Sequence, residues 1–210
     1  MRALGIVMLA VALVGCWSKD SSKLKVEITA EHVAAVNALV PPEWKDKITF
    51  EAGVIKDTSG RQTETYRLAL PAGWKPKAGP LPGQMVPSDA DDFNRSAALG
   101  GGIATMRTSS DCGGECTAKD WAKLVDERYF KKFTTATAGK VTRDESTETS
   151  RTLVYERAAD AGSVDGEVNI LTTWWKKGGS QHFICEAQLA GAAVALAPAF
   201  EKACSRVSAE

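Results

Sequence analysis

The sequence predicts an α+β domain in which helices pack on the faces of an antiparallel β-sheet. Between residues 48 and 189, short segments alternate apolar and polar residues, as half-buried strands do. Three other segments, near residue 36, after residue 120 and before residue 207, carry apolar residues at helical spacing. With 210 residues, the chain is long enough to bury a sizeable core. We therefore expect a single domain, preceded by a separate N-terminal segment.

The N-terminal segment has the layout of an export signal. Arg2 precedes an apolar run from Ala3 to Val14, which is shorter than the roughly 20 residues of a membrane-spanning helix. The run ends in Leu13-Val14-Gly15-Cys16, which resembles a bacterial lipobox, the cleavage and acylation site of lipoprotein precursors. The resemblance implies that residues 1–15 are removed as a signal peptide and that Cys16 is lipidated. The alternative is a plain signal peptide, which would leave Cys16 as an odd cysteine.

The residues after the lipobox bear on location and partners. Residues 16–25 are polar, and we interpret them as a short tether to a domain at 26–210. Trp17 stands where enterobacterial lipoproteins retained at the inner membrane have Asp, so the resemblance favours the periplasmic face of the outer membrane. The expected partner is the lipid bilayer, through acylated Cys16. With 26 basic and 26 acidic residues, no basic excess indicates nucleic acid, and an envelope protein partner stays open.

The first half of the domain is expected to hold one helix and one hairpin. A brief strand at 25–29 leads to a helix with Thr29 as N-cap, which stops before Pro41-Pro42. Alternating segments at 48–54 and 66–70 then predict two paired strands.

Two polar stretches follow this hairpin. The Pro- and Gly-rich segment 71–87 predicts a loop without regular elements. Asp89, Asp91 and Asp92 come next, without the glycine of a calcium loop, which favours a solvated acidic loop over a metal site.

The second half of the domain is expected to complete the sheet. Strands are predicted at 98–106, 139–147, 152–157, 168–175 and 182–189. The strand at 168–175 carries apolar groups on both faces, which predicts cover on both sides. Helices are predicted at 120–133 and at the C-terminus, where Leu196, Phe200, Cys204 and Val207 share one face.

Three stretches resemble the PsbP-like fold. Residues 66–74, Tyr-Arg-Leu-Ala-Leu-Pro-Ala-Gly-Trp, are similar to that family's strand ending in Pro-x-Gly-Trp. The segments 120–133 and 200–207 stand where the family has its first major helix and its closing helix. The resemblance covers roughly residues 48–207 and implies an α/β/α sandwich around an antiparallel sheet. The family's photosynthetic role is not carried over, because nothing in the chain matches a photosystem-binding or metal site.

Four cysteines remain once Cys16 is acylated. An even number in an exported protein indicates two disulfides, and four cysteines allow three pairings. Cys185 shares an apolar strand face and Cys204 an apolar helix face, so we predict that these two bond. Cys112 and Cys116 then bond to each other, because Gly113-Gly114 can bend the chain between them.

The sequence offers few residues for chemistry. No Gly-x-Ser-x-Gly elbow, HExxH motif or zinc-ligand spacing occurs, so no catalytic residue, metal or cofactor is predicted. His182 and Glu186 are interpreted as a surface pair on the polar face of their strand. Trp174 and Trp175 point to opposite faces, which leaves two alternatives: one tryptophan is exposed and suits a binding surface, or helices cover both faces.

These observations favour a non-catalytic, membrane-tethered envelope lipoprotein with an accessory or interaction domain. Two alternatives stay open. One is a thiol-redox protein that uses Cys112 and Cys116, although their spacing is one residue longer than the redox motif Cys-x-x-Cys. The other is a carrier of a small apolar ligand.

Overall fold

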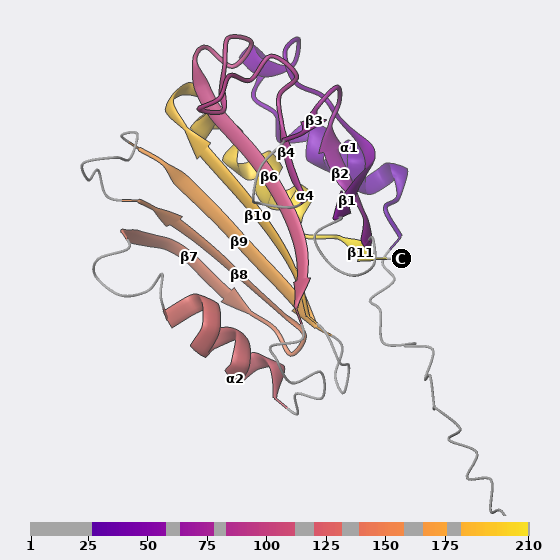
Figure 1. Ribbon diagram of the computed structural model, residues 1–210, viewed down its shortest axis with the longest axis vertical. Helices are drawn as coiled ribbons and strands as arrows, with labels where there is room; N and C mark the ends of the chain where they lie inside the picture. The colour runs from indigo at the N-terminus through magenta and orange to yellow at the C-terminus, as the bar shows by residue number, and fades with distance from the viewer. Residues whose placement is uncertain are drawn as a thin grey trace, which may run out of the picture.

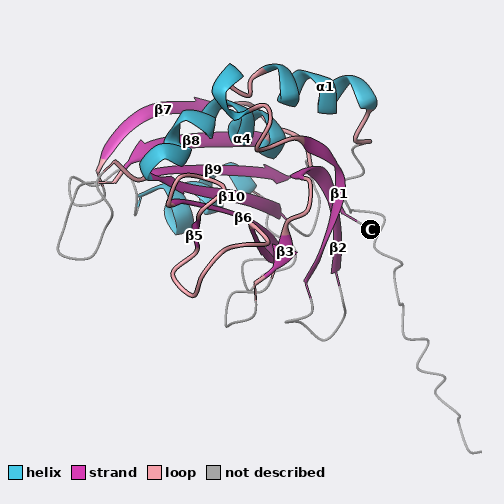
Figure 2. Cartoon of the chain, turned by 90° about the horizontal axis from the view of Figure 1, so that it is seen from above, coloured by secondary structure: helices cyan, strands magenta, loops and turns pink. Residues whose placement is uncertain are grey.

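Two antiparallel sheets form the frame of the domain, and the predicted α+β class is confirmed (Figure 1). The computed structural model describes residues 27–57, 64–77, 83–111, 120–131, 139–157, 166–175 and 182–209. Figure 2 shows helices α1 (Ala30–Ala38) and α4 (Ala197–Cys204) on the same side of the large sheet. Across the described residues, no helix is long and apolar enough to cross a membrane.

The small sheet is the predicted hairpin plus one short strand. Its order is β1 (Phe50–Asp57), β2 (Glu64–Pro71) and β11 (Ser208–Ala209). The sequence alternation places Val54 on the same buried face of β1 as Phe50. This is wrong for Val54, which is 40% exposed, whereas its neighbour Ile55 is buried. The first half of β1 is covered on one face, where Phe50 meets Phe200 at 5.3 Å between ring centroids. The second half turns its other face inward, toward β6.

Helix α1 begins where its cap predicts. The Thr29 side chain accepts a hydrogen bond from the His32 N–H at 3.2 Å, and the helix ends ahead of Pro41. Val36 and Val40 are buried, as the stripe predicts, while Leu39 is 43% exposed. The expected strand at 25–29 is wrong in its described part, because residues 27–29 form no strand.

One side chain of α1 ties this helix to the small sheet. Asn37 donates from Nδ2 to the Phe50 carbonyl at 2.8 Å and accepts from the Phe50 N–H at 2.7 Å. Both backbone groups point away from β2, toward the free edge of β1. The neighbouring residue Thr49 points the other way, since its carbonyl accepts a hydrogen bond from the Ala72 N–H just after β2. Asn37 therefore makes the two hydrogen bonds to Phe50 that a neighbouring strand would otherwise make.

The large sheet has eight strands in the order β3-β4-β6-β10-β9-β8-β7, with β5 paired to β6. They are β3 (Lys75–Pro76), β4 (Gln84–Val86), β5 (Arg95–Ser96), β6 (Gly102–Asp111), β7 (Lys140–Ser146), β8 (Ser150–Glu156), β9 (Val168–Trp175) and β10 (His182–Ala190). The expectation of a loop without elements at 71–87 is wrong, because β3 and β4 lie within it. Strand β6 starts later than predicted, because Gly100 and Gly101 adopt positive φ angles of 64° and 78° in a turn.

Strand β9 is buried on both faces, as its sequence predicts. Ile170 and Trp174 belong to the main core beneath α4, whereas Leu171 and Trp175 belong to a second cluster. That second cluster lies under α2 (Trp121–Val125), which continues as a π-helix over Asp126–Phe130. The outer strand β7 is polar, and its register shifts between Val141 and Arg143.

The C-terminal segment closes the main core. A 3-10 helix at Gly191–Leu196 leads into α4, which buries Phe200 and Cys204. The predicted helical stripe is too long, because the helix ends at Cys204 and the chain continues into β11. Cys204 is bonded to Cys185 of β10, with 5.5 Å between their Cα atoms and both residues 0% exposed.

We expect this bond to hold the terminal helix to the sheet. The Cys185→Ala/Cys204→Ala double variant should lose about 3 kcal/mol of unfolding free energy, because the bond closes a loop with a sequence separation of 19. Urea unfolding measures the loss, and hydrogen exchange should place it in residues 197–204. The matched control is Cys112→Ala/Cys116→Ala, for which the shorter loop predicts about 2 kcal/mol. Equal protection of α4 in both variants would contradict the prediction.

Candidate functional site

The structure describes some of the residues singled out in the sequence. Cys16, Cys112 and Cys116 lie outside the described residues, so their lipidation and pairing stay predictions. Cys185 and Cys204 are described, and both are buried in the main core. A disulfide without solvent access cross-links the fold and is a poor candidate for thiol chemistry.

Helix α2 covers one half of the second face of the large sheet, opposite α4 (Figure 1). In the part of the chain that the structure describes, no helix lies over the other half, which we call the uncovered half. Over the covered half, α2 and the π-helix place three side chains, Trp121, Val125 and Phe130, on the sheet. These side chains meet a group of apolar residues from β8, β9 and β10. That group comprises Leu153, Tyr155, Leu171, Trp175 and Ile184.

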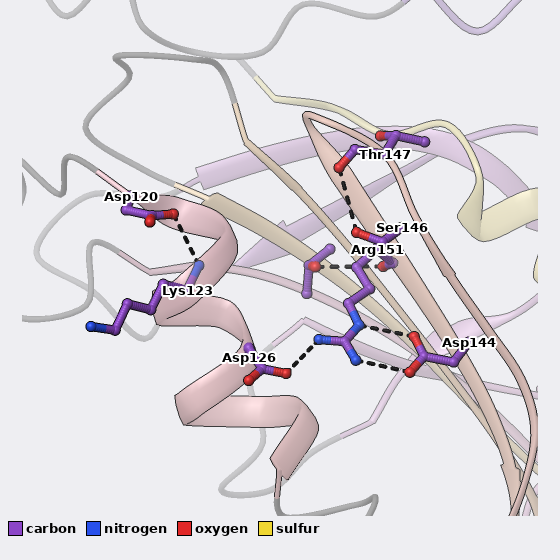
Figure 3. Close-up of polar contacts among 8 residues, drawn as sticks. Asp120, Lys123, Asp126, Asp144, Ser146, Thr147 and Arg151 are labelled. Carbon is purple, nitrogen blue, oxygen red and sulfur yellow. Dashed lines mark hydrogen bonds and ion pairs between the residues drawn. The ribbon is translucent and has the colours of Figure 1, made fainter.

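A single arginine fastens the helix to the covered half (Figure 3). Arg151 of β8 binds Asp144 of β7 with two hydrogen bonds, Nε to Oδ1 at 2.9 Å and Nη2 to Oδ2 at 2.8 Å. Its Nη1 donates to Asp126 of the π-helix at 2.6 Å, and the guanidinium lies 4.3 Å from the Phe130 ring centroid. The arginine side chain is 18% exposed. The hairpin strands β7 and β8 and the π-helix thus share one largely buried cation.

The carboxylate of this cluster is held in its charged form. Hydrogen bonding from Arg151 lowers the pKa of Asp144, against the opposing effect of burial. The same hydrogen bond raises the pKa of Arg151 above its already high ordinary value. Both groups therefore stay ionised across the physiological range, and the cluster serves to position α2 and not to transfer protons.

The uncovered half carries a row of polar side chains, which we call the polar row. It consists of Thr105, Gln188, Asn169 and Tyr155, on β6, β10, β9 and β8. Tyr155, at one end of the row, also packs in the apolar cluster under α2 and so marks the border between the two halves. Each is the direct cross-strand neighbour of the next, so at about 4.8 Å per strand the row is about 14 Å long. Gln188 and Asn169 are half-buried, whereas Thr105 is 5% and Tyr155 8% exposed.

The charges around the polar row are paired with one another. Arg107 and Glu186, in the next register position, form an ion pair at 2.6 Å. On the other side, Glu167 accepts a hydrogen bond from Asn169 Nδ2 at 2.8 Å and lies 3.7 Å from Arg157. The uncovered half is thus rich in hydrogen-bonding groups while its charges balance locally.

Tyr155 is the one ionisable member of the polar row. Burial raises its pKa to about 12, and the carboxylates of Glu186 and Glu167 add to the effect. The phenol therefore stays neutral at physiological pH. Gln188 and Asn169 are the half-buried members of the row, so they are the groups through which this half of the sheet can form hydrogen bonds at its surface.

The interpretation of His182 and Glu186 as a surface pair is wrong. His182 is 0% exposed, and its ring lies 5.0 Å from that of Trp121, centroid to centroid. The two residues share a face of β10, but α2 covers only the end that carries His182. Glu186 lies beyond the helix and pairs with Arg107.

The hypothesis of an exposed tryptophan at 174 or 175 is also wrong. Trp174 is 9% and Trp175 4% exposed, because each face of β9 has its own cover. The Trp175 Nε1–H donates to the Glu148 carbonyl at 3.0 Å, which accounts for its polar atom.

The acidic loop uses its carboxylates to hold itself together. Asp89 accepts from the Ser96 hydroxyl at 2.7 Å and the Ala98 N–H at 2.9 Å, and the bond from Ala98 is the main reason that its pKa is lowered. Asp91 accepts from the backbone of Phe93 and Arg95. In the part of the chain that the structure describes, no group of three or more His, Cys, Asp or Glu side chains could hold a metal ion.

Sequence patterns contained only part of this site. The alternation of Thr105, Arg107 and Ser109 with Ala104 and Met106 would have marked a polar face on β6. Arg151 has no local signal, because Asp126 and Asp144 belong to other elements.

Comparison with known proteins finds solved structures of low similarity and no family. No family model matches the chain, and no curated protein matches it. The Ran-binding protein Mog1p of Saccharomyces cerevisiae is 10% identical, over 75% of this chain and 95% of Mog1p, with a TM-score of 0.45. LpqN, involved in cell envelope biogenesis of Mycobacterium tuberculosis, is 11% identical, over 76% of this chain and 91% of LpqN, with a TM-score of 0.40. At these values we transfer no function from either protein.

Removing the arginine should loosen α2. For Arg151→Ala we expect a loss of about 2 kcal/mol of unfolding free energy, because two carboxylates lose charged hydrogen bonds. Hydrogen exchange should then rise in residues 121–131. The control is Arg143→Ala on the neighbouring strand, whose half-exposed pair with Glu201 should contribute less than about 1 kcal/mol. An equal loss in both variants would argue against a special role for Arg151.

The depressed pKa of Asp144 predicts a pH dependence. A carboxyl whose folded pKa is lowered contributes stability above its unfolded pKa of about 3.9, and this is lost as pH falls through the folded value. The Asp144→Asn variant should therefore be less stable than wild type at pH 6, with the gap narrowing toward pH 2. Urea midpoints at both pH values test this, and a constant gap would show that Asp144 is not the titrating group.

Proposed function

We propose that this chain is a lipid-anchored lipoprotein of the bacterial cell envelope, with a non-catalytic accessory or interaction domain. The observation that carries the proposal is the sequence Leu13-Val14-Gly15-Cys16 at the end of a short apolar run. The buried Cys185–Cys204 bond supports it, because structural disulfides persist mainly in oxidising compartments such as the periplasm.

The anchor sets where the domain would act. Residues 1–15 are removed, the acyl chains on Cys16 enter the bilayer, and residues 16–25 link them to the domain at 26–210. Ten residues span at most about 35 Å, so the domain stays at the membrane surface. Trp17 favours the periplasmic face of the outer membrane.

An interaction role fits the described groups better than catalysis. Three ionisable residues with shifted pKa values have structural roles, since Asp144 holds α2, Asp89 closes its loop, and Tyr155 is buried in the polar row. The uncovered half of the large sheet, with the polar row, is the surface we assign to a partner. A redox role would need Cys112 and Cys116, which lie outside the described residues.

Replacing the anchor residue should release the protein from membranes. Expressed from the full-length sequence in a bacterium, wild-type protein should partition into the detergent phase, and mass spectrometry should find an N-terminal acylated Cys16. The Cys16→Ala variant is expected in the aqueous phase, because no acyl chain can be attached. A wild-type chain that is soluble with a free Cys16 thiol, or that keeps residues 1–15, would refute the anchor.

A further inference from the structure

His32 lies in the interface between α1 and α4. The residue is 5% exposed, and its backbone N–H is already used by the Thr29 cap. Its ring makes one hydrogen bond, to the backbone of Ala203 in α4. In the described part of the chain, Nε2 is buried with no hydrogen-bond partner. In the neutral ring, Nε2 is an acceptor that lacks a donor, which the fold tolerates. In the protonated ring, Nε2 would carry a proton that is buried without an acceptor.

The charges nearest to the ring oppose its protonation. Burial has the largest effect and lowers the pKa of His32. Two cations lower this pKa further, Arg206 just beyond α4 and Lys202 in its last turn. The nearby carboxylates are engaged elsewhere. Glu31, next to His32 on α1, interacts with its own backbone and Thr29, and Glu201 of α4 pairs with Arg143.

We infer that His32 is an acid-sensitive contact, which holds α1 against α4 at neutral pH and releases α1 when the ring gains a proton. In the docked helix the imidazolium would be buried, half-unpaired and beside two cations. In the released helix it would be hydrated. The pKa of the His32 ring is lower in the docked helix than in the released helix. Docking is therefore strongest above about pH 6.5, the pKa of an exposed imidazole, and weakens as the pH falls below that value.

Release of α1 would change the surface of the small sheet. Asn37 leaves with the helix, so the Phe50 N–H and C=O at the free edge of β1 lose their partner. An unpaired strand edge accepts an added strand from another chain. The helix is also the first described element after residue 26, so its release lengthens the link to any N-terminal anchor. The inference does not depend on lipidation of Cys16.

Two measurements on the full chain in detergent test the inference. The sequence has only two histidines, so a carbon–proton NMR spectrum resolves the ring titration of His32 from that of His182. Hydrogen exchange of residues 30–38, converted to protection factors, reports opening of α1. The opening constant should rise roughly tenfold for each pH unit below about 6.5, until the lower pKa of the docked ring is passed. Protection of α4 and β10 should stay constant.

Variants separate the ring from other acid effects. His32→Gln, which stays neutral, should flatten the pH dependence even if α1 is less protected at every pH. Lys202→Ala should reduce the total rise in opening and make it level off at a higher pH, because removing one repelling cation raises the pKa of the docked ring, whereas Lys123→Ala on α2 should leave both unchanged. If α1 protection in wild type is independent of pH between 7.5 and 5.0, or if His32→Gln keeps the same dependence, the inference is wrong.

Discussion

Cover on both faces of β9 and β10 is the constraint on which this domain depends. On one face, α4 packs over Ile170, Trp174 and Cys185, and on the other, α2 packs over Leu171, Trp175 and Ile184. Adjacent residues of one strand thus belong to different cores. At about 25 cal/mol per Å² of apolar area, neither helix can leave without exposing large aromatic side chains. The two central strands are therefore the rigid part to which the other elements attach.

The two faces are held by different means. The main core uses apolar packing and the Cys185–Cys204 bond, which fixes the end of α4. The second face uses the charged cluster around Arg151, and its helix covers only part of the sheet. Where that helix ends, polar groups replace apolar ones, so the border of α2 is also the border of the surface to which we assign a partner.

The sequence predicted features that depend on neighbours along the chain. The Thr29 cap, the β1–β2 hairpin and the two-sided burial of β9 follow from local patterns. Features that depend on distant segments were missed. The prediction of an exposed His182 failed, because only the position of α2, set elsewhere in the chain, decides which end of β10 is covered.

The candidate site divides in the same way. The lipobox-like sequence at residues 13–16 is a local pattern and could be seen directly, whereas the polar row unites four strands that no single segment reveals. Likewise Val54 follows the alternation of β1 but lies outside the core, because the chain exposes that face once it passes α4.

The outer strand β7 has a consequence for crowding. Its register shift at Val141 and its charged residues Lys140, Arg143 and Glu145 make it a poor template for another strand. With the anchor proposed above, copies of this chain would share a two-dimensional surface, where their local concentration would far exceed that of free protein. On such a surface a flat apolar edge would draw neighbouring copies into continuous sheets, and a kinked, charged edge lets many copies lie side by side without fusing.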